Sequence, residues 1–101
     1  MRTVRLSQSF REELPRLLAQ GARFGPSVIA DKRARVIRAI EQFLVQHPKR
    51  PVDPVLGICT YPVTKTPFVL LYSYDDTELR VHLIIHGSAD RSFIDLSAII
   101  W

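Results

Sequence analysis

The sequence predicts a two-layer α+β domain in which a helical hairpin packs on an antiparallel β-sheet, in the element order β-α-α-β-β-β. Three observations predict it. Apolar residues recur at helical spacing within residues 9–46, a proline-rich connector follows over 48–54, and strand patterns occupy 55–86. The chain has 101 residues, of which 47% are hydrophobic and 24% charged, and this size and composition indicate one domain.

The first helix follows a short strand. Residues 3–7 alternate polar and apolar, which predicts a half-buried strand. Ser9 and Glu12 have the spacing of a capping box that opens a helix. Because Pro15 removes a backbone donor, either the helix kinks there or it starts nearer Glu13. The apolar stripe of this helix consists of Phe10, Leu14, Leu17 and Leu18.

The second predicted helix is the longest and covers residues 27–46, after the helix-start signal Gly25-Pro26-Ser27. Its apolar stripe consists of Ile29, Val36, Ile40, Phe43 and Leu44. The other side carries Lys32, Arg35, Arg38 and Gln42. Three prolines then recur at every third position (Pro48, Pro51 and Pro54), so we expect an extended connector.

Three strands are expected to form a meander. Val55–Tyr61 contains Gly57, which indicates a bulge or a close backbone approach, and Pro67–Tyr74 is apolar on both faces, as in a central strand. A turn follows at 75–78. Strict alternation then predicts one face made of Leu79, Val81, Leu83 and Ile85, and the other of Arg80, His82, Ile84 and His86.

The residues after Gly87 have an ambiguous pattern. They are either a short helix capped by Ser92 or Asp90, which we favour, or a final strand. The segment from His86 to Arg91 is the most function-like stretch, because a histidine at a strand end can act as an acid or base and an arginine can hold a phosphate. The same residues also suit simple caps of the strand and the tail.

Metal and nucleophile chemistry are not indicated. His82 and His86 are expected to share a strand face about 13 Å apart, which is too far for one ion to bind both. Cys59 lies in an apolar strand, where cysteine usually packs as a small hydrophobe. We therefore expect no metal and no cofactor.

Charge is unevenly distributed along the chain. Residues 1–50 hold 11 Lys/Arg and 4 Asp/Glu, whereas residues 51–101 hold 3 and 6. The basic first half favours an anionic partner, either protein or nucleic acid, although two solvated helices would have the same composition. No aromatic residue is interleaved with the basic helix face, so base stacking is not suggested.

Several motifs occur in a fixed order. A helix closes with Leu44 and Pro48, a strand runs from Pro67-Phe68 to Tyr72, and an apolar strand ends in His86 with Asp90 following. In this order they resemble the RelE/ParE superfamily of bacterial toxins over nearly the whole chain. The resemblance implies one toxin domain over residues 1–101, belonging to a type II toxin–antitoxin system.

That superfamily has two main branches. RelE-like toxins cleave mRNA on the ribosome with a cluster of basic residues, whereas ParE-like toxins poison DNA gyrase and lack that cluster. From Pro51 onward this chain has only Lys65, Arg80 and Arg91 as basic residues. RNA cleavage without a metal needs cations together with an acid and a base. The resemblance therefore implies a ParE-like gyrase inhibitor that acts by protein–protein binding without catalysis of its own.

Two alternatives stay open. The first is a ribosome-dependent mRNA endonuclease that uses Arg80, His86 and Arg91. The second is a basic module that has kept the fold and binds only its partner. A growth test without any partner separates the second alternative from a toxin.

The resemblance also implies a ParD-like antitoxin, encoded in an adjacent reading frame, whose acidic tail folds onto the toxin. Operator DNA would be reached only through that antitoxin. Amphipathic segments can bury apolar surface on the hairpin, and a peptide strand can extend a sheet edge. The candidate contact residues are Arg11, Arg16, Arg23, Lys32, Arg35 and Arg38.

The expected location is the cytoplasm, without membrane contact. A single cysteine excludes an internal disulfide and fits a reducing compartment. No run approaches the roughly 20 apolar residues of a membrane span, and the first residues lack the apolar block of a signal peptide.

Overall fold

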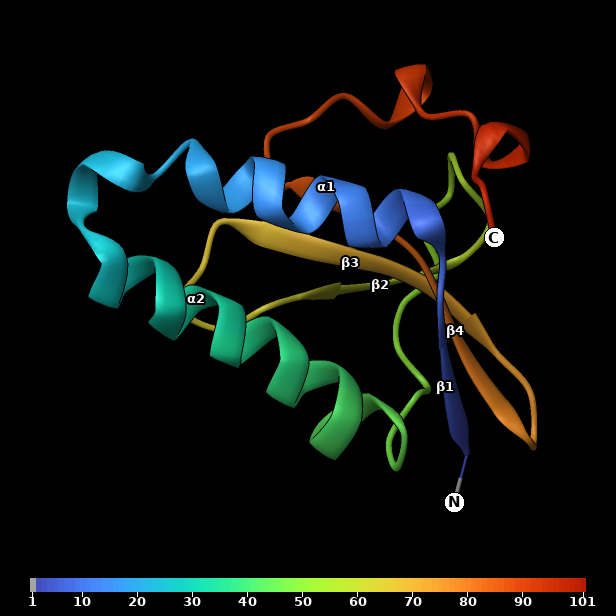
Figure 1. Cartoon of the computed structure of the whole chain (residues 1–101). Coiled ribbons are helices and arrows are strands. Elements are labelled where there is room, and N and C mark those ends of the chain that lie inside the picture. Colours follow the sequence, from blue (N-terminus) through green and yellow to red (C-terminus); the bar gives the residue numbers. More distant parts are fainter. Residues whose placement is uncertain (1) are drawn as a thin grey trace.

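The computed structural model describes residues 2–101 and has two layers, as the sequence predicts. Figure 1 shows helices α1 (Gln8–Ala19) and α2 (Pro26–Arg38) over one face of a four-stranded sheet. The strands are β1 (Thr3–Leu6), β2 (Cys59–Pro62), β3 (Phe68–Tyr74) and β4 (Glu78–His86). Their spatial order is β1-β4-β3-β2.

The sheet is mixed rather than wholly antiparallel. Strands β2, β3 and β4 form the expected antiparallel meander, but β1 pairs parallel with β4. The helical hairpin, the connector and two strands separate β1 from β4, so this pairing is a long-range contact that local patterns do not specify. As a result Arg5 and Arg80 are register partners on neighbouring strands.

Helix α1 begins two residues earlier than its capping-box spacing predicts. Its N-cap is Ser7, whose fully buried hydroxyl accepts a 2.8 Å bond from the backbone N–H of Phe10. The alternative start near Glu13 is wrong, because the helix runs without interruption through Pro15. Pro15 is exposed, where water can bond to the carbonyl left without a helical donor. The predicted stripe is confirmed, with Phe10, Leu14, Leu17 and Leu18 all buried.

The second helix changes its winding in its last third. It begins at Pro26, a residue suited to the first helical turn, and continues from α2 into the π-helical segment η2 (Ala39–Leu44), so it ends two residues short of the predicted 46. Val36, Ile40 and Leu44 of the predicted stripe are buried, and Ile29 and Phe43 are partly buried. Single π segments are rare and frequently lie at functional sites.

The connector is extended, but the strand predicted at Val55–Tyr61 is wrong in its first half. Asp53 instead organises a turn, because its carboxylate accepts bonds from the backbone N–H groups of Val55 and Leu56. Gly57 has a φ of 73° in that turn, a conformation that favours glycine, and β2 starts only at Cys59. Tyr72, which is fully buried, holds the other end of the connector by donating a 2.7 Å bond to the carbonyl of Pro48.

A β-bulge at His82 contradicts the predicted strict alternation of β4. Val81 lies opposite Tyr72 and Leu83 lies opposite Leu71, so His82 is the extra residue. An extra residue exchanges the two faces for the rest of the strand. Leu79, Val81 and Ile84 therefore face the helices, whereas Leu83 and Ile85 pack on the opposite face.

The bulge also separates the two histidines that were expected on one face. His86 is the register partner of Phe68, which belongs to the core beneath the helices. His82 stays on the other face of the sheet, where its imidazole bonds to Ser73. The expected shared face is therefore wrong.

The C-terminal tail forms two short 3₁₀ turns, η3 (Arg91–Phe93) and η4 (Leu96–Ala98), rather than one helix or a strand. Asp90 caps the first turn by accepting a bond from the N–H of Ser92. The tail covers the second face of the sheet, and it ends beside the start of α1 (Figure 1), where the carbonyl of Ile100 accepts a 2.7 Å bond from Gln8.

Candidate functional site

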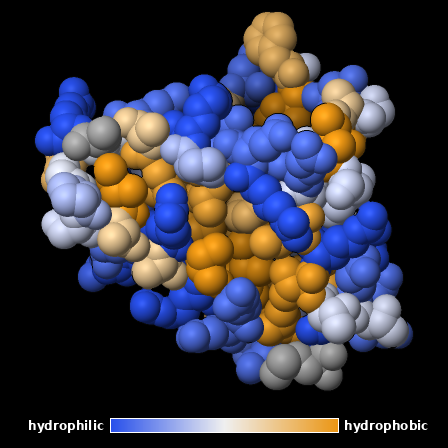
Figure 2. Space-filling view, in the orientation of Figure 1, coloured by the Kyte–Doolittle hydropathy of each residue, from blue (hydrophilic) through white to orange (hydrophobic). Residues whose placement is uncertain are grey.

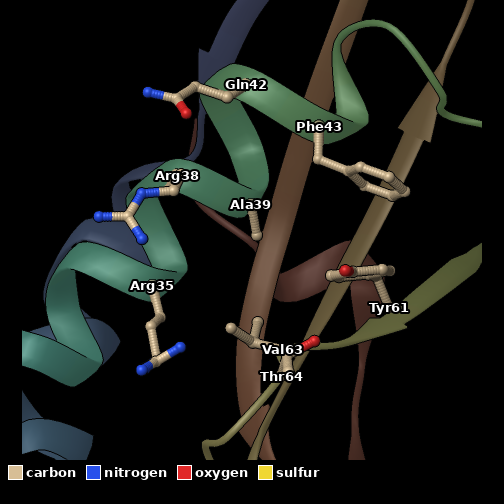
Figure 3. Close-up of a pocket in the computed structure, with 8 residues that line it drawn as sticks. All are labelled: Arg35, Arg38, Ala39, Gln42, Phe43, Tyr61, Val63 and Thr64. Atoms are coloured by element: carbon tan, nitrogen blue, oxygen red, sulfur yellow. The ribbon is translucent and has the colours of Figure 1, made fainter.

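An open groove lies between the second helix and strand β2. Its volume is about 340 Å³. Arg35, Arg38 and Gln42 project from successive turns of the helix along one rim, and Tyr61, Val63 and Thr64 lie on the opposite side (Figure 3). The π-helical segment contributes Ala39 and Phe43 as well as Gln42, so the unusual winding lies at this groove.

The floor of the groove is aromatic and stacked. The rings of Phe43 and Tyr61 lie 5.4 Å apart between centroids, and both point into the groove (Figure 3). The guanidinium of Arg50 lies over both rings, at 4.6 Å from Phe43 and 5.4 Å from Tyr61. Its buried Nε has no hydrogen-bond partner within residues 2–101. The floor is therefore an apolar, aromatic surface, and the charge of Arg50 lies against its two rings although Arg50 does not line the groove.

The rim is basic. None of the residues lining the groove is acidic. Arg35 bonds to Asp31 one helical turn earlier, at 2.9 Å, whereas exposed Arg38 makes no ion pair within the described part of the chain. Surface ion pairs such as Arg35–Asp31 are weak and exchange readily. An acidic segment with apolar residues thus fits the groove in both charge and surface.

The structure brings together only part of the basic set predicted for partner binding. Arg35 and Arg38 share the groove. Arg11 and Arg16 are exposed on α1, where Arg16 pairs with Glu13. Arg23 and Lys32 both lie over the ring of Phe24 at the end of the hairpin.

Sequence reasoning missed the aromatic floor of the groove. Phe43 has the spacing of a core residue, and Tyr61 belongs to a strand that starts later than predicted. Arg50 stands between prolines in the connector and carries no pattern of its own. The only sign of this aromatic floor in the sequence is that Phe43 and Tyr61 flank the proline-rich connector.

The three residues named for a nuclease do not converge. Arg80 and His86 lie at opposite ends of β4, about 20 Å apart by strand rise, and His86 faces the helices. Arg80 is bound to Asp75 at 2.8 Å and Glu78 at 3.2 Å, and these carboxylates raise its pKa. Arg91 donates to the carbonyls of Gly87 and Ala89, and its Nε lies 3.4 Å from the carboxylate of Asp53.

A different polar group gathers on the face of the sheet away from the helices. We call it the sheet-face cluster, and it consists of Arg5, Ser73, Arg80, His82 and Trp101. The Nε2 atom of His82 lies 2.8 Å from the hydroxyl of Ser73. Trp101 meets His82 edge-on at 4.8 Å between centroids, and the guanidinium of Arg5 lies 5.0 Å from the centre of the indole. Parallel pairing of β1 and the return of the tail create this cluster, so the sequence alone did not reveal it.

His82 is expected to make the fold weaker in acid. Burial beneath the tail, together with the charge of Arg80, lowers the pKa of His82 below 6.5, so the folded protein keeps its imidazole neutral. As the pH falls through 6.5, the unfolded chain takes up a proton before the folded one does, and the free energy of unfolding declines until the folded pKa is passed. Urea unfolding at a series of pH values, followed by the fluorescence of Trp101, measures the decline.

The matched control for this pH effect is His82→Asn. This variant keeps a polar side chain beside Ser73 but cannot titrate, so the part of the pH dependence due to His82 should vanish. His47 and His86 are exposed and remain in both proteins. An unchanged pH profile in the variant would show that His82 is not the group responsible.

Other chemistry is poorly represented within residues 2–101. No group of three or more His, Cys, Asp or Glu side chains in this range is placed to hold a metal ion. Cys59 is half-buried against the core. Among the helices described, none is both long and apolar enough to cross a membrane.

Comparison with known proteins gives no family assignment. No protein-family model matches the sequence, and no curated protein matches it at a significant level.

Proposed function

We propose that this chain is the toxin component of a type II toxin–antitoxin system and that it acts by docking on another protein. The observation that carries the proposal is the contrast between its two halves. In the groove Arg35 has the single partner Asp31 and Arg38 makes no ion pair within the described residues, whereas Arg80 in the second half contacts both Asp75 and Glu78, and Arg91 contacts Asp53. Neutralised cations are poorly suited to stabilising the charge that develops on a phosphodiester during cleavage.

The antitoxin is expected to be ParD-like, with an acidic tail that folds as it binds. Electrostatic complementarity with the basic rim would speed association, and the aromatic floor would hold apolar side chains. Apolar side chains also reach the surface in a band between α1 and α2 (Figure 2), which suits the apolar face of an amphipathic helix. This chain would then meet operator DNA only through the antitoxin.

A peptide strand from the antitoxin would have one suitable sheet edge. The outer side of β2 is partly covered, because Val52 bridges to Cys59 and Thr60 donates to the carbonyl of Pro51. This strand also ends at Pro62, which lacks a backbone donor. Strand β1 forms the opposite edge of the sheet, so strand addition is expected there.

The proposed target is DNA gyrase, in the cytoplasm. This part of the proposal rests on the resemblance to the ParE-like branch and on the neutralised cations of the second half. Inhibition would come from binding rather than from a reaction catalysed by this chain, so neither a metal nor a cofactor takes part.

The runner-up is a ribosome-dependent mRNA endonuclease, and the sheet-face cluster favours it. A neutral His82 can act as a general base at pH 7, and Arg5 makes no ion pair within residues 2–101. The nuclease site would then consist of Arg5, Arg80 and His82, in place of the Arg80, His86 and Arg91 expected from the sequence. The cover provided by Trp101 and the two carboxylates on Arg80 weigh against it.

Purified protein distinguishes the two functions. We expect it to block supercoiling by gyrase and to leave mRNA intact on translating ribosomes. The double variant Arg5→Gln/His82→Asn should inhibit gyrase as well as the parent does. If the parent cleaves mRNA on ribosomes and this variant does not, the nuclease is correct; if neither activity nor growth arrest is found, the toxin proposal fails and the binding module remains.

A further inference from the structure

A second cavity, of about 160 Å³, lies at the end of the helical hairpin. It forms where the last turn of α1 and the first turns of α2 meet the start of β3 and the end of β4. Polar residues line it together with apolar side chains, of which Leu17, Leu18 and Phe68 are buried and Ile29 is partly buried. A cavity of about 150 Å³ lined by such side chains accommodates a molecule the size of benzene.

Three of the lining side chains carry nitrogen: the amide of Gln20, the ammonium group of Lys32 and the imidazole of His86. None of the residues lining the cavity is a carboxylate. The ammonium group of Lys32 lies 5.6 Å from the centre of the Phe24 ring and forms no ion pair within residues 2–101. The cavity therefore combines apolar side chains with a positive charge that lacks a counter-ion among its lining residues.

The contacts of His86 fix which ring nitrogen carries the proton. The backbone N–H of Ser88 donates to Nδ1 at 3.2 Å, so Nδ1 is an acceptor in the neutral imidazole. The hydroxyl of Ser88 lies 2.7 Å from the same atom. The proton is thus on Nε2, and His86 offers an N–H donor that has no partner within the described residues. An acceptor group on a ligand would supply the missing hydrogen-bond partner of this N–H group.

We propose that this cavity binds a compact monocarboxylate with an apolar body about the size of a benzene ring. The body would lie against Leu17, Leu18 and Phe68, and the carboxylate would accept bonds from the Lys32 ammonium group and from Nε2–H of His86. Charge-assisted bonds of this kind fix orientation as well as adding affinity. This cavity is separate from the groove beside the second helix. The proposal that it binds a carboxylate therefore does not depend on the toxin proposal.

Phenylacetate is a suitable probe, with neutral phenylacetamide as its matched control. Titration into the isotopically labelled full chain should shift the methyl signals of Leu17, Leu18 and Ile29 saturably, with a Kd on the order of 1 mM or tighter. The amide keeps the ring but lacks the charge, so it should bind at least about tenfold more weakly. Equal binding of acid and amide would overturn the carboxylate assignment, and an absence of shifts at these methyls would overturn the site.

Variants test the two donors separately. Lys32→Gln and His86→Phe should each weaken phenylacetate binding by about tenfold. Arg33→Gln removes a charge from an exposed neighbour that does not line the cavity, so it should bind as the parent does. Circular dichroism checks that each variant is folded. Full binding in both folded donor variants would show that the acid is held elsewhere.

Discussion

Replacing Ser7 by alanine is expected to lower the free energy of unfolding by about 2–4 kcal/mol. The hydroxyl of this fully buried side chain makes two bonds at once. It accepts from the N–H of Phe10, which caps α1, and it donates to the carbonyl of His82 at 2.6 Å. Loss of the cap alone costs about 1 kcal/mol, and the partly buried carbonyl of His82 left without this donor adds about 1–3 kcal/mol.

Ser9→Ala is the matched control for this substitution. Ser9 also makes a hydroxyl bond, accepting at 2.9 Å from the N–H of Ile100, but it is partly exposed and ties down only the tail. Its loss is expected to cost about 1 kcal/mol or less. Urea unfolding with unchanged slopes gives both values. A larger loss for Ser9 than for Ser7 would contradict the helix start described above.

The helices were predictable because their signals are local. The stripe of α1 and that of the second helix repeat every three or four residues, and burial of the core side follows directly from that spacing. Ser9 misled the prediction of the helix start, because Glu12 stands three residues later as in a capping box. In the structure Glu12 instead accepts a bond from the side chain of Gln8, and Ser7 makes the cap.

The sheet was predictable in outline but not in register. The apolar run of β3 and the turn at Asp75 have local signatures, and the carboxylate of Asp75 indeed accepts bonds from the N–H groups of Thr77 and Glu78. The bulge at His82 has no local signature, because it is defined by how β4 pairs with β3; Ser7, the N-cap of α1, donates to the carbonyl of the bulged residue. One extra residue was enough to make half of the predicted faces wrong.

The candidate site was the least predictable part, because tertiary contacts assemble it. Phe43 and Tyr61 come from a helix and a strand on either side of the proline connector, and Arg50 joins them from within it. In the same way the sheet-face cluster needs β1, β4 and the last residue of the chain. The basic face of the second helix was predictable from the sequence, but its position beside Tyr61, Val63 and Thr64 was not.

Reversing both charges on the groove rim, in Arg35→Glu/Arg38→Glu, is expected to weaken binding of the proposed antitoxin by about 100-fold or more. The proposal places the acidic tail along this rim, so each substitution replaces an attraction by a repulsion. The surrounding fold should be little affected, because Arg38 is exposed and the single partner of Arg35, Asp31, lies on the surface. Calorimetric titration with the product of the adjacent reading frame, at low and high salt, measures the change.

The position of the charge, and not only its sign, decides whether the groove is the docking site. Arg33 lies on the same helix, is exposed and does not line the groove, so Arg33→Glu is the control for general electrostatic attraction. We expect Arg33→Glu to bind the proposed antitoxin nearly as tightly as the parent does. Its binding should also lose less of its salt dependence than that of Arg35→Glu/Arg38→Glu. If the proposed function is correct, cells expressing Arg35→Glu/Arg38→Glu should arrest growth even when the proposed antitoxin is present, because neither substitution is expected to disturb the fold. Equal weakening by Arg33→Glu would mean that the antitoxin senses the overall charge of the helix and docks elsewhere.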